Sequence, residues 1–536
     1  CKAACPAHIA VQGYLKLAAQ GKYREALQLI KRENPFPAVC GRICNRRCED
    51  ACTRGTVDQA VAIDEVKRFI AQQDLDAATR FVPEKVIPKV DGEFDQQIAV
   101  IGGGPAGLSC AYYLAEKGYR PTVFEKEQRL GGMLENGLPS FRLEKDVVRA
   151  EIDVLREMGV QFRCGVEVGK DVTIAQLRQE GFRGFYVAVG LQSGGKLDIP
   201  GGDAQGVMAG IDFMRQVNGG QCSKLAGPVV VIGGGNIAAD VARTAVRCGA
   251  ESVDLYCLEG YDEMPMGAED RGECERDGIT IHAGWGQTEV VTRDGHAAGI
   301  RFRKCLRVKD DQGRFAPVFD DNDACEAACA TVLYCIGQKV DWRQLLTGTA
   351  VTFNPNGTAQ VDPVTYQTAE PDIFAGGDAV TGQKFAIDAI AAGKEGAISL
   401  HRFVQKATLT IGRNRRRFVE LDKENALIPV GFDNTPRQRI GYNEALRRTF
   451  RDERVAFTAE QVQKETARCL SCGASVVDPN KCIGCGVCTT KCAFDAIHLH
   501  RERPECTNMI PSEDKMKAIL PYMVKRQIKI RKARKK

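Results

Sequence analysis

The cysteines of this chain gather at its two ends, at spacings that suit iron–sulfur chemistry. Of the 23 cysteines in 536 residues, six lie within residues 1–52 and seven within residues 469–506. Thiolates at short, repeated intervals can surround one metal centre. Disulfide bonds are the alternative, but the total is odd and no signal peptide is recognisable. The two ends therefore predict metal-ligand clusters on either side of a conventional enzyme body.

The C-terminal group contains the cysteine spacing of bacterial ferredoxins. Residues 482–492 read C-x2-C-x2-C-x3-C, in which the first three thiolates hold one [4Fe–4S] cluster and the fourth usually belongs to a second cluster. Cys469 and Cys472 form a further C-x-x-C and could begin that second cluster with Cys492, although no fourth ligand is obvious. A zinc ribbon is the alternative, but it leaves Cys488 and Cys492 unused.

The N-terminal group places cysteines four residues apart. Cys1-x3-Cys5 is followed by a C-x3-C-x3-C-x3-C run over residues 40–52. On a helix this interval stacks thiols on one face, and in a loop it still gathers them around one centre. We expect at least one cluster here. The candidate metal ligands at the two ends are Cys1, Cys5, Cys40, Cys44, Cys48, Cys52, Cys469, Cys472, Cys482, Cys485, Cys488 and Cys492.

A first glycine motif, within residues 96–132, predicts a dinucleotide site. Gly102, Gly104 and Gly107 form G-x-G-x-x-G after an apolar strand. Gly102 makes the tight turn, Gly104 lets a pyrophosphate approach the backbone, and Gly107 lets the helix pack closely on the sheet. The helix N-terminus then attracts the phosphates. Glu125, which ends the next strand, suits a ribose hydroxyl.

A second glycine motif lies about 130 residues later and predicts a second site. Gly233, Gly235 and Ala238 form G-x-G-x-x-A, and the following strand ends at Glu259 with no adjoining arginine. A carboxylate there favours a free 2′-hydroxyl and repels a 2′-phosphate, so we expect NAD(H) rather than NADP(H). The alternative is that Glu259 faces solvent and an arginine from elsewhere, such as Arg271, binds the phosphate.

Two dinucleotide folds in one chain are what a flavin–nicotinamide oxidoreductase needs, one for FAD and one for the nicotinamide. The middle of the chain resembles the small subunit of glutamate synthase. It also resembles the flavin and iron–sulfur region of dihydropyrimidine dehydrogenase and the large subunit of NADH-dependent ferredoxin:NADP oxidoreductase. The segments that carry the resemblance, within about residues 1–405, are VIGGGPAGLSCAYYLAEKG, VFEKEQRLGGML, VVVIGGGNIAADVART, DEMP and DIFAGGDAV.

The resemblance implies roles for individual residues. The first glycine unit would bind FAD, with Glu125 on its ribose and Asp378 at the ribityl or pyrophosphate region. Members that bind NADP usually carry two arginines where this chain has Cys257 and Leu258, which supports NAD(H). Gly131 and Gly132 would pass near the flavin. The candidate cofactor-binding residues are Gly102, Gly104, Pro105, Ala106, Gly107, Glu125, Lys126, Gly131, Gly132, Gly190, Gly377, Asp378, Gly233, Gly235, Asn236, Ala238 and Glu259.

The resemblance also implies ligand sets for two N-terminal clusters. Cysteines matching Cys5, Cys44 and Cys48 would bind one cluster, whose acidic or amide fourth ligand falls here at about Lys67, a poor ligand for iron. Matches to Cys1 and Cys52 would join two further upstream cysteines that are not in this sequence. The thirteen terminal cysteines do not divide evenly into all-cysteine clusters, so we expect a ligand outside them, or one upstream of Cys1, to complete the set. Other candidates for the fourth position of the first cluster are Cys40 and Glu65.

These sites must be positioned by an α/β fold with two Rossmann-like domains, the NAD domain inserted in the FAD domain. A helical iron–sulfur domain precedes them and a ferredoxin-like α+β domain follows. Apolar spacing predicts helices over residues 9–30 and 62–76. The expected regions are a helical iron–sulfur domain (1–80), a linker (81–95), a first FAD-binding segment (96–220), an NAD-binding domain (221–335), a second FAD-binding segment (336–406), a charged linker (407–465), a ferredoxin-like domain (466–510) and a basic tail (511–536).

Composition and charge indicate an ordinary soluble protein, with 44% hydrophobic and 27% charged residues. No apolar run approaches the roughly 18 residues that would span a bilayer. The net charge of +5 comes from the tail, because residues 525–536 carry eight Lys and Arg and no acid. We expect this tail to be solvated or to dock a subunit, with no nucleic-acid partner. A cytoplasmic location is expected.

The sequence thus predicts an NAD(P)H-dependent FAD and iron–sulfur oxidoreductase subunit. NADH delivers hydride to FAD, and two to four [4Fe–4S] clusters carry the electrons singly to a partner subunit or ferredoxin in a hetero-oligomer. Electrons could equally flow in the opposite direction, toward NAD⁺. The ferredoxin module favours a larger electron-transfer complex, and an electron-bifurcating complex is one form of it. One alternative is a glutamate synthase small subunit that feeds a glutamine-dependent large subunit. Another is a non-catalytic scaffold that only wires clusters together.

Overall fold

The computed structural model divides the chain into two units, Cys1–Cys472 and Gly473–Lys536. The first unit contains both glycine motifs and the N-terminal cysteines. The linker expected at 81–95 lies largely outside the described residues. Those residues are 1–84, 94–222, 224–413, 422, 423, 428, 431–472, 482–491, 497–499 and 510–533.

The first parallel sheet has the strand order β15-β4-β1-β2-β3. Its central strand β1 is buried at Ile98–Ile101, because helices cover both faces of a parallel sheet. α14 packs closely on α6 at Gly393, where a Cβ would overlap the carbonyl oxygen of Ala106. The elements of this domain are β1 (Gln97–Ile101), α6 (Pro105–Glu116), β2 (Thr122–Glu125), α7 (Met133–Asn136), α8 (Lys145–Glu157), β3 (Gln161–Cys164), α9 (Ile174–Gln179), β4 (Phe182–Val187), β15 (Ile373–Ala375), α13 (Asp378–Thr381) and α14 (Ala386–Val404).

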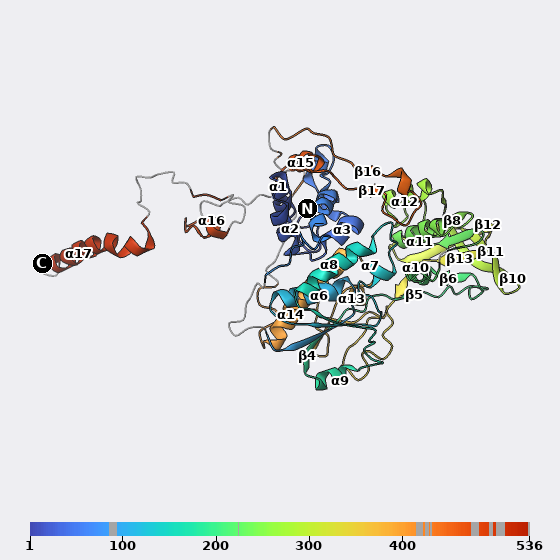
Figure 1. Cartoon of the computed structure of the whole chain (residues 1–536), viewed down its shortest axis with the longest axis horizontal. Helices are drawn as coiled ribbons and strands as arrows, with labels where there is room; N and C mark the ends of the chain where they lie inside the picture. The colour runs from blue at the N-terminus through green and yellow to red at the C-terminus, as the bar shows by residue number, and fades with distance from the viewer. Residues whose placement is uncertain are drawn as a thin grey trace. The chain divides into compact units, whose positions relative to one another are not determined.

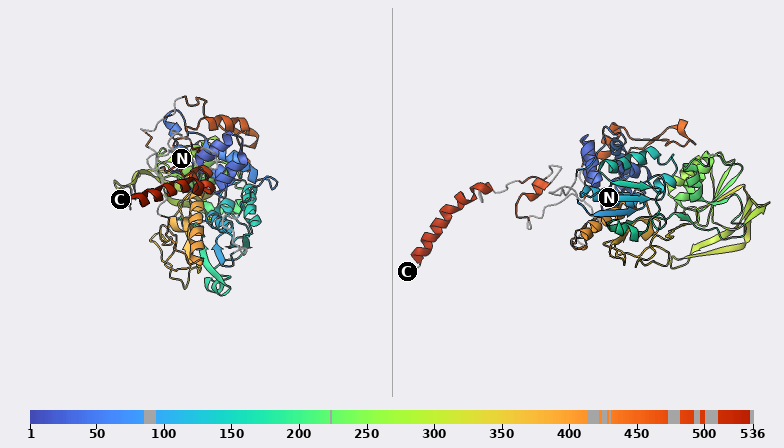
Figure 2. Two further views of the ribbon diagram at one scale, coloured as in Figure 1. Left: turned by 90° about the vertical axis from the view of Figure 1, so that its left-hand side faces the viewer. Right: turned by 60° about the horizontal axis from the view of Figure 1, so that its bottom comes forward.

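The second parallel sheet, ordered β6-β13-β7-β8-β9, is inserted between β4 and β15 of the first. Figure 2 shows the two sheets from two further sides. This insertion confirms the predicted topology of one nucleotide domain within another. The sheet includes β6, which precedes the expected domain start at 221. Its elements are β6 (Val207–Ala209), α10 (Gly210–Asn218), β7 (Val229–Ile232), α11 (Asn236–Arg247), β8 (Val253–Cys257), α12 (Ala268–Arg276), β9 (Thr280–Ala283) and β13 (Thr331–Tyr334).

Two smaller sheets accompany the second nucleotide domain. Three long antiparallel strands form the order β10-β11-β12, and a short two-stranded ribbon pairs β5 with β14. The ribbon joins the segments that enter and leave the inserted domain. These strands are β5 (Ser193–Gly194), β10 (Trp285–Arg293), β11 (His296–Lys309), β12 (Phe315–Ala328) and β14 (Gln338–Lys339).

The N-terminal domain is helical, as predicted, but the helix expected over residues 9–30 is two helices. The chain turns at Gly21, whose φ of +71° suits glycine. Another glycine, Gly41, lets α3 cross α5, since a Cβ there would lie 2.7 Å from the Cα of Arg68. The elements are α1 (Val11–Ala19), α2 (Tyr23–Lys31), α3 (Pro37–Ile43), α4 (Arg47–Asp50), η1 (Thr53–Thr56), α5 (Ile63–Ala71) and η2 (Gln72–Asp74).

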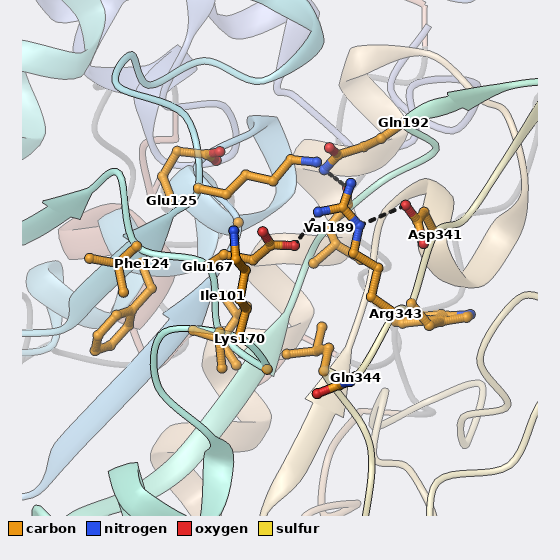
Figure 3. Close-up of a pocket in the computed structure, with 17 residues that line it drawn as sticks. Ile101, Phe124, Glu125, Glu167, Lys170, Val189, Gln192, Asp341, Arg343 and Gln344 are labelled. Atoms are coloured by element: carbon orange, nitrogen blue, oxygen red, sulfur yellow. Dashed lines mark hydrogen bonds and ion pairs between the residues drawn. The ribbon is translucent and has the colours of Figure 1, made fainter.

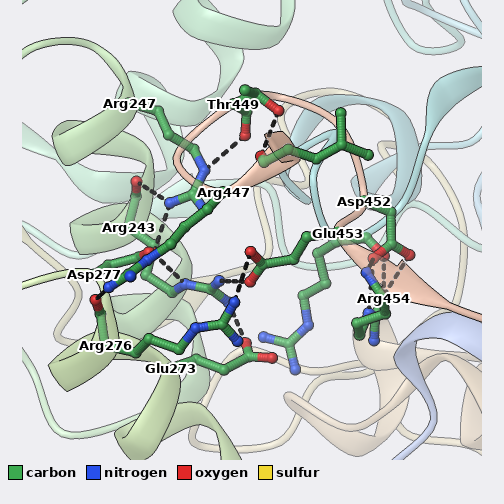
Figure 4. A network of polar contacts seen from close by, with 12 residues as sticks. Arg243, Arg247, Glu273, Arg276, Asp277, Arg447, Thr449, Asp452, Glu453 and Arg454 are labelled. Atoms are coloured by element: carbon green, nitrogen blue, oxygen red, sulfur yellow. Dashed lines mark hydrogen bonds and ion pairs between the residues drawn. The ribbon is translucent and has the colours of Figure 1, made fainter. Parts of the chain in front are cut away.

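Residues 431–472, which we call the return segment, contact the N-terminal domain at Arg437, reach the end of α12 at Arg448 and return to the N-terminal domain at α15. Figure 1 shows α15 of this segment beside α1. Figure 4 shows the polar network that the segment forms with α11 and α12. The return segment contains β16 (Gly441–Tyr442), η3 (Glu444–Leu446), β17 (Arg454–Val455) and α15 (Ala459–Ala467). In the second unit the described elements are α16 (Val487–Lys491), η4 (Ser512–Asp514) and α17 (Lys515–Ala533).

Candidate functional site

The first glycine motif forms the turn between β1 and α6. Gly102 has a φ of +108°, and a Cβ there would overlap the carbonyl oxygen of Ala188. A Cβ on Gly107 would overlap the carbonyl oxygen of Gly102. Around Gly104, in contrast, the nearest atom to an added Cβ is 3.9 Å away. The motif therefore packs tightly at its ends and stays open at its centre, where a pyrophosphate would lie.

Glu125 is held against this turn by the backbone. Its Oε2 accepts from the N–H of Gly103 at 2.6 Å, and its Oε1 accepts from the N–H of Glu127 at 2.9 Å. Burial raises the pKa of Glu125, although these two donors favour its ionised form. The carboxylate is thus fixed at the end of β2, beside the glycine turn, where a ribose hydroxyl is bound in dinucleotide folds.

The other candidate residues of the first nucleotide domain converge on the same turn. Gly131 donates its N–H to the carbonyl of Gly103 at 2.8 Å. Gly132 lies so close that a Cβ would be 2.9 Å from the Cα of Gly104. Asp378 begins α13, and burial raises its pKa to about 6. Hydrophobic and small residues from both nucleotide domains complete one cavity, which is lined by Gly102, Gly104, Pro105, Ala106, Glu125, Gly132, Gly190, Asn236, Gly377 and Asp378 among others.

A second cavity continues on the far side of Gly102 and Glu125, which line both spaces. Figure 3 shows its polar rim, where Arg343 donates to Glu167 at 2.5 Å and to Asp341 at 2.9 Å. Lys126 also lines this cavity. Gly102, Glu125, Val189 and Gln192 line both spaces, so the residues around the glycine turn are those that could hold FAD. The open centre at Gly104 supports this fit.

The second glycine motif repeats the arrangement at the start of α11. Gly233 has a φ of +139°, and Gly235 has no atom within 4 Å of an added Cβ. Asn236 accepts from the N–H of Gly267 at 3.2 Å and lines the cavity described above. Ala238 is fully buried where α11 meets the sheet. The N-terminus of α11 therefore opens toward the cleft of the first motif.

Glu259 folds back onto the second glycine turn as Glu125 folds onto the first. An added Cβ on Gly234 would lie 2.8 Å from its Oε2. Arg271, the alternative phosphate ligand, donates to the carbonyl of Tyr261 at 2.7 Å and packs over that ring. The carboxylate, rather than this guanidinium, lies beside the turn, which is the arrangement that favours a free ribose hydroxyl.

The N-terminal domain places Cys44 and Cys48 near one buried ammonium group. Burial raises the pKa of both thiols, and Lys67 lowers it in part. Lys67 pairs with Asp64 at 2.5 Å, and both side chains are buried. Cys5 contributes to the same electrostatic environment at Cys44. The three cysteines implied for one cluster are thus linked electrostatically through Cys44, and Lys67, at the expected fourth-ligand position, pairs with Asp64.

The two alternatives for the fourth ligand differ in their surroundings. Cys40 is 1% exposed on α3, one turn before Cys44, and its pKa is raised by burial. Glu65 accepts from Arg46 at 3.3 Å. One carboxylate oxygen of Glu65 is therefore already used by an arginine.

The cavity at the first glycine turn extends to the residue that precedes Cys44. Ile43 lines the cavity together with Gly104, and the residue after it is Cys44. Arg142, on the same wall, pairs with Asp240 at 2.8 Å and with Asp270 at 3.0 Å, and so joins the two nucleotide domains. Sequence reasoning missed Ile43 and Arg142, because only the tertiary fold brings them beside the glycine turn.

In the second unit, Cys482, Cys485 and Cys488 are exposed, and Cys492 lies outside the described residues. Every described cysteine is free of disulfide bonds. Within the described ranges, no three His, Cys, Asp or Glu side chains converge closely enough to hold one metal ion. A four-iron cluster carries each thiolate on a separate iron, so its ligands stand further apart than those of a single ion.

The fold and the cleft define a flavin- and nicotinamide-dependent oxidoreductase, and comparison with known proteins agrees. Residues 96–393 match the family described as pyridine nucleotide-disulphide oxidoreductase, and the chain belongs to it. Residues 1–79 match dihydropyrimidine dehydrogenase domain II, 4Fe-4S cluster, and residues 475–498 match a 4Fe-4S binding domain. These matches confirm the predicted kinds of cofactor, which are FAD, NAD(P) and [4Fe–4S] clusters.

Curated relatives include subunits of redox enzymes and putative oxidoreductases. The chain is 34% identical over 501 residues to the NADP(+)-dependent formate dehydrogenase subunit beta of Moorella thermoacetica, covering 88% of this chain and 70% of that protein. It is 32% identical to the NADPH glutamate synthase small chain of Halomonas elongata, covering 74% and 86%. It is 31% identical to the putative oxidoreductase YgfK of Escherichia coli, of which it spans 47%. The predicted oxidoreductase subunit of a multi-subunit family is confirmed.

Among solved structures, FprA from Mycobacterium tuberculosis shares the fold. One FprA structure aligns with a TM-score of 0.50 at 16% identity, over 70% of this chain and 99% of FprA. This likeness confirms the predicted α/β architecture. In the described portion of the chain, no helix has the length and apolar character to cross a membrane.

Proposed function

We propose that this chain exchanges electrons between NAD(H), FAD and iron–sulfur clusters as one subunit of a larger electron-transfer complex. The observation that carries the proposal is the shared cavity, which joins the first glycine turn, the N-terminus of α11 and Ile43 beside Cys44. When bound, FAD accepts hydride from a nicotinamide and releases electrons singly to clusters. The residues of the cavity support a flavin site, a nicotinamide site and a cluster pocket that lie side by side.

The chain's own residues orient and shield this exchange. Gly104 and Gly235 leave open space for the two pyrophosphates, and Glu125 fixes a ribose. Arg142 fastens the nicotinamide domain to the flavin domain through two buried carboxylates. We propose NAD(H) as the nucleotide because Glu259, and no adjoining arginine, follows the second strand of that domain. The formate dehydrogenase and glutamate synthase relatives are named for NADP(+) and NADPH, so a comparison of NADH with NADPH tests this assignment directly.

The partner is proposed to be a further redox subunit or ferredoxin, with the protein in the cytoplasm, where thiols stay reduced. The chain covers 70% of the formate dehydrogenase subunit and matches cluster domains at both of its own ends, so a formate-oxidising partner is one class. A glutamine-dependent partner is the second candidate, favoured by the 86% coverage of the glutamate synthase small chain.

The test is anaerobic reduction of the purified native protein by NADH and by NADPH. We expect bound FAD whose absorbance is bleached by NADH, followed by reduction of the clusters, which electron paramagnetic resonance detects. If FAD were absent, or if neither nucleotide bleached the flavin absorbance, the proposal would be wrong and the chain would be a non-catalytic scaffold that connects clusters. A strong preference for NADPH would contradict the nucleotide assignment but not the electron-transfer role. Subunits that co-purify identify the partner class.

A further inference from the structure

Helix α8 of the first nucleotide domain supports one wall of the shared cavity. Its first residue, Lys145, donates from Nζ to the carbonyl oxygen of Leu134 at 2.8 Å and to that of Leu138 at 2.6 Å. Both leucines line the cavity. Nearly one turn later, Val148 lies beside Gly131, where an added Cβ would be 3.1 Å from its Cγ1. α8 is therefore attached to residues that surround the proposed flavin site.

The same helix holds α3 of the N-terminal domain through the side chain of Glu151. The Oε1 of Glu151 accepts from the N–H of Ala38 at 2.7 Å, and its Oε2 accepts from the N–H of Val39 at 2.9 Å. All three residues are at most 1% exposed. Figure 1 shows α3 and α8 side by side. One buried carboxylate thus joins two helices that belong to different domains.

The start of α3 needs an acceptor that its own segment does not provide. The first N–H groups of a helix have no partner within the helix, and a side chain at the N-cap usually accepts from them. α3 begins at Pro37, and its N-cap Phe36 makes no such bond. Glu151 supplies the acceptor from α8. Without it, the buried N–H groups of Ala38 and Val39 would lack a partner, and α3 would be free to shift.

α3 leads directly to the cysteine expected to bind a cluster. Ile43, its last residue, lines the shared cavity, and Cys44 follows as the C-cap. The N–H of Cys44 donates to the carbonyl of Cys40 at 3.1 Å, so the backbone of Cys44 continues the hydrogen bonding of the helix. The position of Cys44 relative to the cavity is therefore set by where α3 lies.

We infer that Glu151 is a positioning residue that sets the separation between the flavin and the cluster that Cys44 would bind. The inference rests on the proposed function and names a residue that serves it. α8 holds the cavity wall through Lys145 and α3 through Glu151. In the step concerned, the reduced flavin loses one electron and an oxidised cluster gains it, after NADH has supplied the electron pair.

This role affects one step of the reaction. Electrons pass between two bound centres at a rate that falls steeply with their separation, so a small shift of α3 slows the flavin-to-cluster step. Glu151 does not line the shared cavity. The transfer of hydride from the nicotinamide to the flavin should therefore not depend on it.

The experiment times the two steps separately in full-length protein purified without oxygen. Stopped-flow mixing with NADH measures flavin bleaching, and flash photoreduction of the bound flavin without nucleotide measures the electron transfer to the cluster. Glu151→Ala should retain FAD and iron, bleach at the native rate, and reduce the cluster about tenfold more slowly. Glu151→Gln keeps one acceptor oxygen and should slow the same step less.

The control variant is Ile300→Ala, which removes a fully buried side chain of β11 in a hydrophobic core that contains no residue of α3 or α8. It should lower the melting temperature and leave the flavin-to-cluster rate unchanged. The resonance spectrum and the reduction potential of the cluster should stay native in both Glu151 variants, because Glu151 is not a ligand.

Three outcomes would overturn the assignment. These are a native flavin-to-cluster rate in Glu151→Ala, an equal slowing in Ile300→Ala, and a shifted cluster potential, which would attribute the effect to charge and not to spacing. If Glu151→Ala does not fold, Glu151→Gln decides by the same measurements, and a native rate in it contradicts the inference. Native protein that lacks FAD, or whose flavin NADH does not bleach, would instead contradict the proposed function.

Discussion

At the scale of single residues, some glycines of the two turns are required by the fold, whereas others leave space in which a ligand can bind. Gly107 is required by the backbone, because any Cβ would overlap the carbonyl of Gly102. Gly235 has a φ of −99° and empty space around it, so the protein fold does not require glycine there. A position that is free of protein contacts yet held open by glycine points to a ligand that approaches the backbone.

Substitution at these two positions should therefore have opposite effects. We expect Gly235→Ala to retain FAD and the melting temperature of the native protein, and to raise the KM for the nicotinamide at least tenfold. That factor is about 1.4 kcal/mol of binding. Gly107→Ala should lose FAD and unfold at a lower temperature. Flavin content, thermal melts and steady-state reduction measure this, and an unchanged KM in Gly235→Ala would place the pyrophosphate elsewhere.

The nucleotide preference is also a matter of single side chains. The double variant Leu258→Arg with Glu259→Ala supplies a cation for a 2′-phosphate and removes the carboxylate at the second turn. We expect the ratio of kcat/KM for NADPH over NADH to rise at least tenfold, about 1.4 kcal/mol. Glu125→Ala serves as the control, because it should reduce FAD content and leave that ratio unaltered. A ratio that does not move would mean that Glu259 does not contact the ribose.

At the scale of elements, the return segment is held against α11 and α12 by buried ion pairs (Figure 4). Asp277 lies at the centre of the network and is 2% exposed. It accepts from Arg243 at 2.8 Å and from Arg247 at 2.7 Å, while Arg448 of the return segment donates to its carbonyl at 2.6 Å. The network fixes the return segment, and with it the C-x-x-C, relative to the nucleotide domain.

Asp277→Asn should destabilise the protein because it leaves two buried guanidinium groups short of a counter-charge, at a cost of about 3 kcal/mol. Although burial alone would raise it, the hydrogen bonds from Arg247 and Arg243 place the pKa of Asp277 below its ordinary value. Its stabilisation is therefore complete above about pH 4 and is lost as the pH falls through the lowered pKa. Thermal melts should show a lower melting temperature for Asp277→Asn near neutral pH and no difference from the native protein in acid. The control variant Asp311→Asn, at an exposed position, should melt like the native protein at both pH values.

At the scale of the whole molecule, the chain consists of a flavin and cluster unit and a separate ferredoxin-like unit. A chain ending at Cys472 should keep FAD, and NADH should still reduce it. Its iron content should fall by about four, the content of one cluster, and electron delivery to an external ferredoxin should slow. An unchanged iron content in the truncated chain would contradict a cluster in the second unit.

The sequence by itself determined the chemistry of each local motif. The spacing of Gly102, Gly104 and Gly107 and of the run at 482–492 encodes turns and ligand sets that form within a few residues, so local rules suffice to predict them. It did not determine which distant segments meet. Only the tertiary structure places Ile43 at the flavin cleft and Cys472 beside Thr53, because both contacts depend on how α3, α15 and the nucleotide domains pack. Long-range packing, and not local spacing, decides which cysteines can share one cluster.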